Sequence, residues 1–278
     1  DYHVLNRQNI ETEFEKIKQL GINTIKFEGN SVYNYNVLNI ANENNFDIAF
    51  GFWIPAHFDF IKDSLQIRKL KSDILKRLTK YKNNEHITSW NIQNDVQYNQ
   101  KDYFLKPRLL YQKRAYIIWL QDLVREIKKI DSTRPVIVDL EVNKLSLFHS
   151  KMLIDNIEGL DGIGLVLKND SNLESLIAYL ESRKMNYIFS EINVDNLIQP
   201  EIFNKQHSFF ITSWRDIHES NILKFNGITD RKGRFKDEYF KLFNALQDSV
   251  VETNISKIRI LKPALLIYKD KIYDYHAM

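Results

Sequence analysis

The chain has 278 residues, 44% hydrophobic and 27% charged, which suits one large domain or two ordinary ones and excludes a disordered or fibrous protein. Its 39 basic and 36 acidic residues leave a formal charge of +3, too small to indicate a nucleic acid partner. No stretch has the ~18 to 20 uncharged apolar residues of a membrane helix. The absence of cysteine excludes disulfides and thiolate metal sites and fits a reducing or an oxidising compartment.

Short apolar runs alternate with longer amphipathic stretches along most of the chain, which predicts repeated strand and helix units. Seven runs rich in β-branched and aromatic residues are expected as strands, at residues 22–27, 47–53, 87–92, 135–142, 162–167, 187–192 and 209–214. Seven amphipathic stretches are expected as helices, at residues 11–20, 35–44, 60–81, 109–129, 146–157, 173–183 and 236–247. Gly21 stands where the first helix should stop, and the segment at residues 131–135 should end the fourth.

This alternation favours an α/β fold, a (β/α)₈ TIM barrel, because no glycine-rich phosphate-binding turn follows the first strand. The remaining strand is expected at residues 2–5 or before the chain begins. After residue 249 the pattern changes to short strand-like runs at residues 257–261 and 264–268. We therefore expect a barrel domain over residues 1–249, followed at 250–278 by a β-strand extension or the start of a second, truncated module.

Polar residues at the ends of the predicted strands are the candidates for a site, because (β/α)₈ barrels build theirs at the C-terminal face. Many of these residues are carboxylates. The strand ends offer Lys26, Glu28, Trp53, His57, Asn94, Asp95, Asp139, Glu141, Lys168, Glu191, Trp214 and Asp216. Two carboxylates flanked by aromatic platforms suit cleavage of a glycosidic bond, because one protonates the leaving oxygen while the other attacks or activates water.

Several segments resemble the barrels of clan A glycoside hydrolases, above all those of family 2. Residues 20–26, Leu-Gly-Ile-Asn-Thr-Ile-Lys, resemble the second strand of these enzymes, and residues 37–53 resemble their second helix and third strand. Ser190 and Glu191 resemble the nucleophile strand, while residues 209–214 and 227–236 resemble the eighth strand and the approach to the last helix. The resemblance spans roughly residues 10–247, and the ordered combination is more specific than any single motif.

The resemblance implies roles for individual residues. The fourth-strand motif Trp-x-x-x-Asn-Glu falls on residues 90–95, where Asp95 replaces the acid/base glutamate. Its side chain is one methylene shorter, so its carboxyl would lie roughly 1.5 Å back, a displacement that can cost about 10²-fold in rate. Asn94 matches the ligand of the sugar 2-hydroxyl, Glu191 the nucleophile and Trp214 the aromatic floor beside the cleaved bond.

Other positions depart from the family pattern or have a plainer interpretation. Lys26 replaces the arginine that steadies the nucleophile, which keeps the charge but loses the bidentate fork. Glu191 can also be read as a strand-end carboxylate paired with Lys26, and Asp95 as a cap after the fourth strand. Trp53 and Trp214 can be packing residues, as can Trp90. The substrate-binding candidates beyond Asn94 and Trp214 are Lys26, Trp53, His57, Glu28 and Glu141, of which His57 is also readable as an incidental loop histidine.

The resemblance implies a retaining glycosidase that uses two carboxylates on a β-linked glycan, with Glu191 as nucleophile and Asp95 as acid/base. The alternative is a catalytically impaired barrel that binds or guides a glycan within a larger carbohydrate-processing protein, and a purely structural scaffold is the third possibility. The expected partner is an oligo- or polysaccharide, with no nucleic acid, no membrane span in this segment and further domains of the same chain possible. No cofactor or metal is expected, since no set of His, Asp and Glu has metal spacing. The compartment is left open, with an extracytoplasmic or envelope-associated bacterial setting as the expectation.

Overall fold

The structure is a computed structural model that describes residues 7–28, 34–167, 173–192, 209–212, 214, 216–219, 222–224, 227–230, 232–240, 243–244 and 263–268. Its parallel strands follow the closed order β1-β10-β7-β6-β5-β4-β3-β2, with helices alternating along the chain. The fold class is therefore the predicted α/β barrel. Two compact units are distinguished: Asp1–Ile48 with Phe189–Met278, called unit 1, and Ala49–Ile188, called unit 2.

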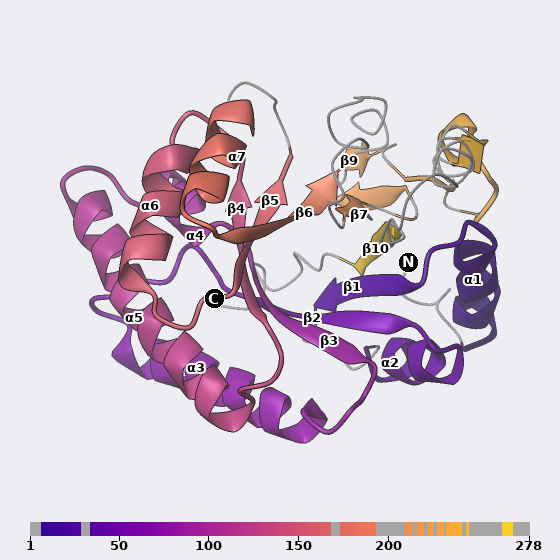
Figure 1. The fold of residues 1–278 in the computed structure, drawn as a ribbon, viewed down its shortest axis with the longest axis horizontal. Coiled ribbons are helices and arrows are strands. Elements are labelled where there is room, and N and C mark those ends of the chain that lie inside the picture. Colours follow the sequence, from indigo (N-terminus) through magenta and orange to yellow (C-terminus); the bar gives the residue numbers. More distant parts are fainter. Residues whose placement is uncertain are drawn as a thin grey trace. The chain divides into compact units, whose positions relative to one another are not determined.

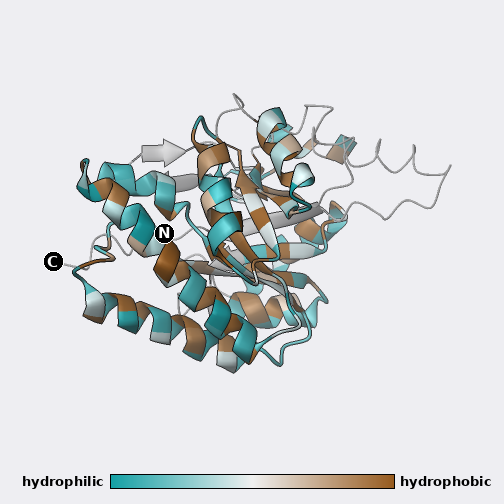
Figure 2. Cartoon of the chain, turned by 60° about the vertical axis from the view of Figure 1, so that its left-hand side comes forward, coloured by the Kyte–Doolittle hydropathy of each residue, from teal (hydrophilic) through white to brown (hydrophobic). Residues whose placement is uncertain are grey.

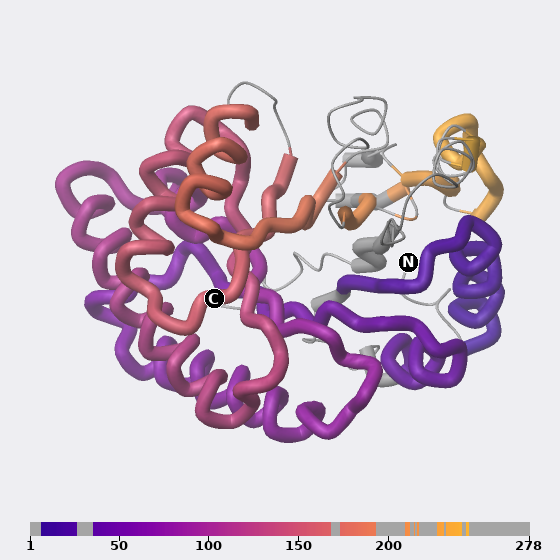
Figure 3. The backbone as a smooth tube through the Cα atoms, viewed as in Figure 1, coloured from indigo at the N-terminus to yellow at the C-terminus, as the bar shows by residue number. Residues whose placement is uncertain are grey.

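Unit 2 is a run of strand and helix repeats, as the sequence alternation predicts (Figures 1 and 3). Its strands are β3 (Ile87–Gln93), β4 (Val136–Glu141) and β5 (Gly162–Val166), preceded by β2 (Asp47–Trp53), which begins in unit 1. Its longer helices are α3 (Ser64–Tyr81), α5 (Arg108–Ile130), α6 (Ser146–Asn156) and α7 (Leu173–Ser182). Strands β3, β4 and β5 pair in parallel, and consecutive helices pack against one another. A short helix pair, α4 (Val96–Asn99) and the 3₁₀ turn η2 (Gln100–Asp102), follows β3 and was not predicted.

Unit 1 contains the remaining strands and the first two helices. Its elements are α1 (Arg7–Gln19), β1 (Thr24–Glu28), α2 (Asn34–Glu43), β6 (Asn186–Ile192, which begins in unit 2), β7 (Phe209–Thr212), β10 (Pro263–Tyr268) and the antiparallel pair β8 (Ile217–Glu219) and β9 (Ile222–Lys224). Strand β10 pairs in parallel with both β1 and β7. The position expected for residues 2–5, between the last and first predicted strands, is thus taken by the run predicted at 264–268. Residues 2–5 and 257–261 lie outside the described residues.

The helices form where apolar residues recur at helical spacing, so that each helix buries one stripe and exposes the other (Figure 2). Helix α1 shows this clearly, because its apolar positions Ile10, Phe14 and Ile17 are all buried. Gly21 ends this segment with φ +76°, a left-handed conformation that glycine adopts without strain, and its N–H donates to Lys18 O at 2.9 Å. The predicted helix stop is confirmed. Within the described residues no helix is long and apolar enough to cross a membrane.

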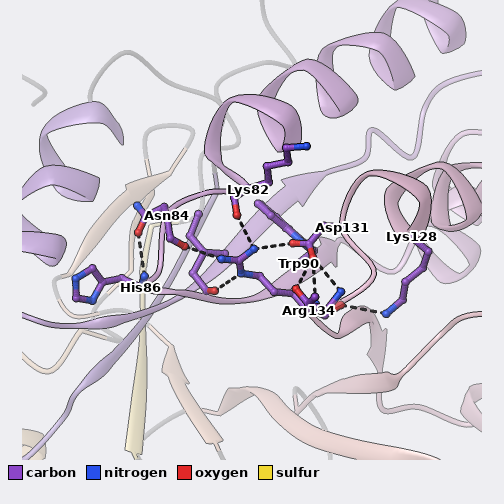
Figure 4. A network of polar contacts seen from close by, with 9 residues as sticks. Lys82, Asn84, His86, Trp90, Lys128, Asp131 and Arg134 are labelled. Atoms are coloured by element: carbon purple, nitrogen blue, oxygen red, sulfur yellow. Dashed lines mark hydrogen bonds and ion pairs between the residues drawn. The ribbon is translucent and has the colours of Figure 1, made fainter.

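A polar network holds together the connections that enter β3 and β4 (Figure 4). The Arg134 guanidinium donates to Asp131 Oδ2 at 2.7 Å, to Lys82 O at 2.6 Å and to Asn84 O at 2.8 Å, and also to the Ile87 carbonyl. The indole N–H of Trp90 donates to the same Asp131 oxygen at 2.9 Å. These contacts lie at the N-terminal ends of the strands. In (β/α) barrels the residues at this end stabilise the fold, whereas the catalytic residues lie at the C-terminal ends. The hydrogen bond to Asp131 satisfies the buried indole N–H of Trp90, so Trp90 is a packing residue.

Candidate functional site

The inward face of the unit 2 strands is polar, whereas barrel interiors are usually filled by branched apolar side chains. Side chains alternate along a strand, so Asn91 and Gln93 face opposite to Trp90, whose indole packs on Phe50 and Phe52 among the helices. Asn91 donates to Asp139 Oδ1 at 3.0 Å, which joins β3 to β4 across this face. The same face carries buried Ser89 and Glu141. A polar layer of this kind is able to hold hydrophilic ligands or water.

Asp95 begins the segment that follows β3, and backbone amides on two elements hold its carboxylate. Oδ1 accepts from Tyr98 N at 3.1 Å, which makes Asp95 the N-cap of α4, and Oδ2 accepts from Glu141 N at the end of β4 at 3.0 Å. Asp95 as a whole is 6% exposed. The interpretation of Asp95 as a cap after the predicted strand at residues 87–92 is thus confirmed, and its role in catalysis stays a prediction.

The pKa of Asp95 is raised from its ordinary value to about 7, chiefly because burial disfavours the charged form. The two backbone N–H donors act against this shift, since they stabilise the carboxylate. The negative charge of Glu141 raises the pKa further, and the positive charge of Lys113 lowers it. A carboxyl group poised near neutral pH can both give and take a proton, which is the property a general acid/base needs.

Asn94 lies in the left-handed region with φ 72°, a conformation that asparagine tolerates better than most residues. Its Nδ2 donates to Ile54 O at 2.7 Å, and its Oδ1 accepts from Asn99 Nδ2 at 2.6 Å. These contacts tie the end of β2 to the end of β3 and to α4. They fix the backbone turn that precedes Asp95, and the expected contact of Asn94 with a sugar 2-hydroxyl stays a prediction.

Lys113 and His149 form a buried pair that the sequence did not reveal. Lys113 on α5 lies with its Nζ 2.9 Å from His149 Nε2 on α6. Because lysine only donates, Nε2 is the acceptor and the imidazole is neutral. Burial lowers the pKa of His149 to about 3, and the neighbouring Lys113 charge adds to the effect. Burial also lowers the pKa of Lys113, while Asp95 raises it. No sequence motif carries this signal, since the pair is made by two helices.

The other unit 2 candidates lie at the ends of β2 and β4. Glu141 is 8% exposed, and its carbonyl accepts from Asn143 Nδ2 at 2.8 Å and Ser146 Oγ at 3.0 Å. His57 packs edge-on against Phe58, with ring centroids 4.9 Å apart, and lies 5.8 Å from the ring of Tyr103, which is exposed. Trp53 ends β2, and its indole nitrogen is buried without a hydrogen-bond partner in the described part of the chain.

In unit 1 the structure brings Lys26 to β6, next to Glu191. Lys26 on β1 is fully buried, its Nζ donates to Ser190 Oγ and lies 3.4 Å from Ser190 O, and it sits 5.9 Å from the Phe210 ring centroid. Ser190 directly precedes Glu191, which is 9% exposed. The pairing of β6 with β7 shifts register between Phe189 and Ile192, an irregularity of the kind that re-aims side chains beside active sites. Glu28 ends β1, and its side chain lies outside what the structure describes.

Trp214 is 4% exposed, and its indole N–H donates to Glu13 on α1, so it is tied to a helix of unit 1. Its carbonyl accepts from Thr229 N at 2.8 Å, and Lys16 bridges Glu13 to Gly233 O. These contacts are those of a packing residue. The role of Trp214 as a sugar platform stays a prediction. Among the described residues, no cluster of three or more His, Asp or Glu side chains has the arrangement of a metal site.

Solved structures with this fold include several glycosidases. The chain is similar to a family 2 β-galacturonidase from Eisenbergiella tayi, with a TM-score of 0.65 and 13% identity over 88% of this chain and 48% of the other. It is similar to a β-galactosidase from the psychrophilic Marinomonas ef1, with a TM-score of 0.69 and 8% identity over 91% of this chain and 59% of the other. It is also similar to β-glucuronidase 2 of Bacteroides uniformis, with a TM-score of 0.63 and 14% identity over 91% of this chain and 34% of the other.

At these identities the likeness shows a shared fold. The chain spans between 34% and 59% of the length of these three proteins. No family model matches the sequence. No curated protein matches it either.

Proposed function

We propose that the chain is the barrel of a glycoside hydrolase similar to family 2 enzymes, and that it cleaves a β-linked glycan with retention. The observation that carries the proposal is Asp95, a buried carboxyl at the C-terminal end of a parallel strand whose pKa is raised to about 7. The general acids of glycosidases are carboxyl groups whose pKa is raised in this way. The glycosidases that share the fold support the same reaction class.

In the proposed reaction protonated Asp95 gives its proton to the glycosidic oxygen as the bond to the anomeric carbon breaks. The Glu191 carboxylate attacks that carbon and forms a glycosyl ester. Asp95, now a carboxylate, takes a proton from water, and the water oxygen attacks the anomeric carbon and releases Glu191. The sugar keeps its configuration, and both carboxyl groups return to their starting state. A retaining mechanism requires the two carboxyl groups about 5 to 5.5 Å apart.

The surrounding candidates take supporting roles in this proposal. Lys26, through Ser190, holds the backbone that carries Glu191, and Asn94 is the ligand of the 2-hydroxyl. Trp214 supplies the sugar platform. Further hydroxyl ligands come from Trp53, His57, Glu28 and Glu141. The substrate is an oligo- or polysaccharide, and other domains of the same protein are expected to complete its recognition.

The second candidate function is a barrel that binds or guides a glycan without cleaving it. One observation favours it: both carboxylate oxygens of Asp95 already accept backbone N–H donors, from Tyr98 and from Glu141. A capping carboxylate is a weaker proton donor, because those donors stabilise its charged form. The shorter side chain of aspartate acts in the same direction.

Hydrolysis of aryl β-glycosides with good leaving groups separates the two candidates, since such substrates need little acid assistance. We expect turnover by the native chain, loss of at least about 10³-fold in Glu191→Gln and little change in Asp95→Asn. With poor leaving groups the contribution of Asp95 to the rate should become measurable. Hydrolysis by Asp95→Asn should be slower than by the native chain by about 10² to 10⁴-fold, and hydrolysis by Asp95→Glu should be faster. Absence of turnover with every leaving group, together with glycan binding, would leave the non-catalytic barrel.

A further inference from the structure

Gln93 is a buried amide that no other described residue satisfies. It is 4% exposed, and neither its Oε1 nor its Nε2 has a hydrogen-bond partner in the described part of the chain. Asn91, two residues earlier on the same face of β3, instead donates to Asp139. A buried amide without partners costs roughly 1–3 kcal/mol for each polar group, and native proteins seldom keep one without a reason.

Gly51 on β2 leaves the room that this amide occupies. A Cβ at position 51 would lie 2.8 Å from Gln93 Oε1 and closer still to the rest of the amide group. The φ of Gly51 is not in the left-handed region, so the backbone does not require glycine there. The side chain of Gln93 requires it. Glycine at position 51 therefore serves the placement of one polar side chain on the inward face of the strands.

Trp53 adds a second unsatisfied group to the same face. It lies two residues beyond Gly51 on β2, and its buried Nε1 has no hydrogen-bond partner within the described ranges. Together the two side chains offer one acceptor, the Gln93 Oε1, and donors on Gln93 Nε2 and Trp53 Nε1. Both stand at the C-terminal ends of their strands, and Gln93 immediately precedes Asn94 and Asp95.

We infer that Gln93 and Trp53 bind neighbouring hydroxyl groups of a sugar residue, and that Gly51 provides the clearance for this contact. A hydroxyl both donates and accepts, so a vicinal pair satisfies an amide oxygen and an amide N–H together. Small-molecule sites are typically apolar with a few convergent polar groups of this sort. The inference rests on the proposed function only in taking a carbohydrate as the ligand, and it does not need the ligand to be cleaved.

Equilibrium binding tests the inference without relying on turnover. The probes are aryl β-thioglycosides, whose sulfur linkage resists hydrolysis, titrated calorimetrically into the native chain, Gln93→Met and Gly51→Ala. We expect both variants to lose about 10- to 100-fold in affinity, Gln93→Met because the amide is gone and Gly51→Ala because the added Cβ displaces it. Deoxy thioglycosides then locate the contact, since the analogue lacking the bound hydroxyl should bind the native chain and Gln93→Met equally.

Gln112→Met is the matched control. Gln112 is also fully buried, but its amide is bonded to Asp59 and to Phe60 N. Its replacement should lower the melting temperature and leave thioglycoside affinity unchanged. Gln93→Met should lower thioglycoside affinity and should not lower the melting temperature, because an unpartnered buried amide does not stabilise the fold.

Failure of the inference and failure of the proposed hydrolysis have different signatures. Thioglycosides that bind Gln93→Met and Gly51→Ala as tightly as the native chain would overturn the inference, and the amide would then hold buried water. No thioglycoside binding by the native chain would overturn it too. If thioglycoside binding depends on Gln93 but the chain cleaves no O-glycoside, the inference is supported and the proposed hydrolase function is refuted.

Discussion

Replacing Arg134 with methionine should lower the free energy of unfolding by about 3–5 kcal/mol, the range for removing one partner of a buried ion pair. The Arg134 side chain is 17% exposed and that of Asp131 is 4% exposed, so solvent screens the pair weakly. The variant leaves Asp131 buried without its cation. It also removes the donors to the carbonyls of Lys82, Asn84 and Ile87. Methionine keeps much of the packing against Trp90, so the loss reports mainly on the polar contacts.

Urea unfolding followed by tryptophan fluorescence measures this difference, because Trp90 lies in the network itself. Arg134→Lys keeps the positive charge but loses the planar fork, so it should recover only part of the stability. Arg125→Met is the matched control, on helix α5 just before the connection that carries Arg134. The Arg125 side chain is 61% exposed in its pair with Asp122, and such surface pairs contribute about 0–1 kcal/mol. A loss below about 1 kcal/mol in Arg134→Met, or equal losses in the two methionine variants, would refute the reasoning.

Four further outcomes are expected from single residues. Because the acid must be protonated and the pKa of Asp95 is about 7, kcat/KM for glycosides with poor leaving groups should fall as the pH rises through 7, while a flat profile from pH 5 to 9 would contradict the acid role. Lys113→Met should move that descending limb to higher pH, because the Lys113 charge lowers the pKa of Asp95; an unmoved limb would show that the pair acts only in packing. Burial raises the pKa of Asp131, but hydrogen bonds from Thr133, Arg134 and Trp90 together outweigh burial and hold that pKa well below its usual range. The stabilisation by Asp131 is therefore complete above about pH 4 and is lost at lower pH. Asp131→Asn should therefore lower the free energy of unfolding at pH 7, measured by urea unfolding. The difference in this free energy between the variant and the native chain should become smaller below pH 4. A difference that does not change with pH would contradict the proposed effect of Asp131 ionisation on stability. Gly21→Ala should cost about 1 kcal/mol, since φ +76° is strained for alanine, and an unchanged unfolding midpoint would count against that strain.

The alternation of apolar runs predicted most of the fold, because the residues that each strand buries follow one another closely in the sequence. The run at residues 47–53 coincides with β2, and that at 87–92 with β3 to within one residue. What the pattern did not reveal was the short helix after β3, where the sequence is polar and lacks an apolar stripe. Its start depends on a single cap, Asp95, whose second hydrogen bond comes from Glu141 on another strand.

The candidate site was predicted only in part, because sequence position indicates which residues reach a strand end and not which partners they meet there. Asp95 and Glu141 were expected at neighbouring strand ends, and the structure joins them through a backbone hydrogen bond. The pairing of Lys113 with His149 depends on the crossing of α5 and α6, and no local motif records it. Gln93 was overlooked because its neighbours in the chain carried the family resemblance, and its significance depends on a glycine in β2.

The pairing of β10 with β1 has a consequence for how the protein is made. Thr24 is in register with Ala264, so this contact closes a very long loop of chain, and such contacts form late and slowly. Unit 2 is one continuous stretch, Ala49–Ile188, whereas unit 1 joins segments from the two ends of the sequence. As the ribosome releases the chain from its N-terminus, unit 2 is complete before Phe189 emerges. Residues 1–48, with the buried lysine of β1, lack their partners from residues 189–278 until that segment has been made. Unpaired strands and exposed apolar surface in such an interval are prone to aggregation.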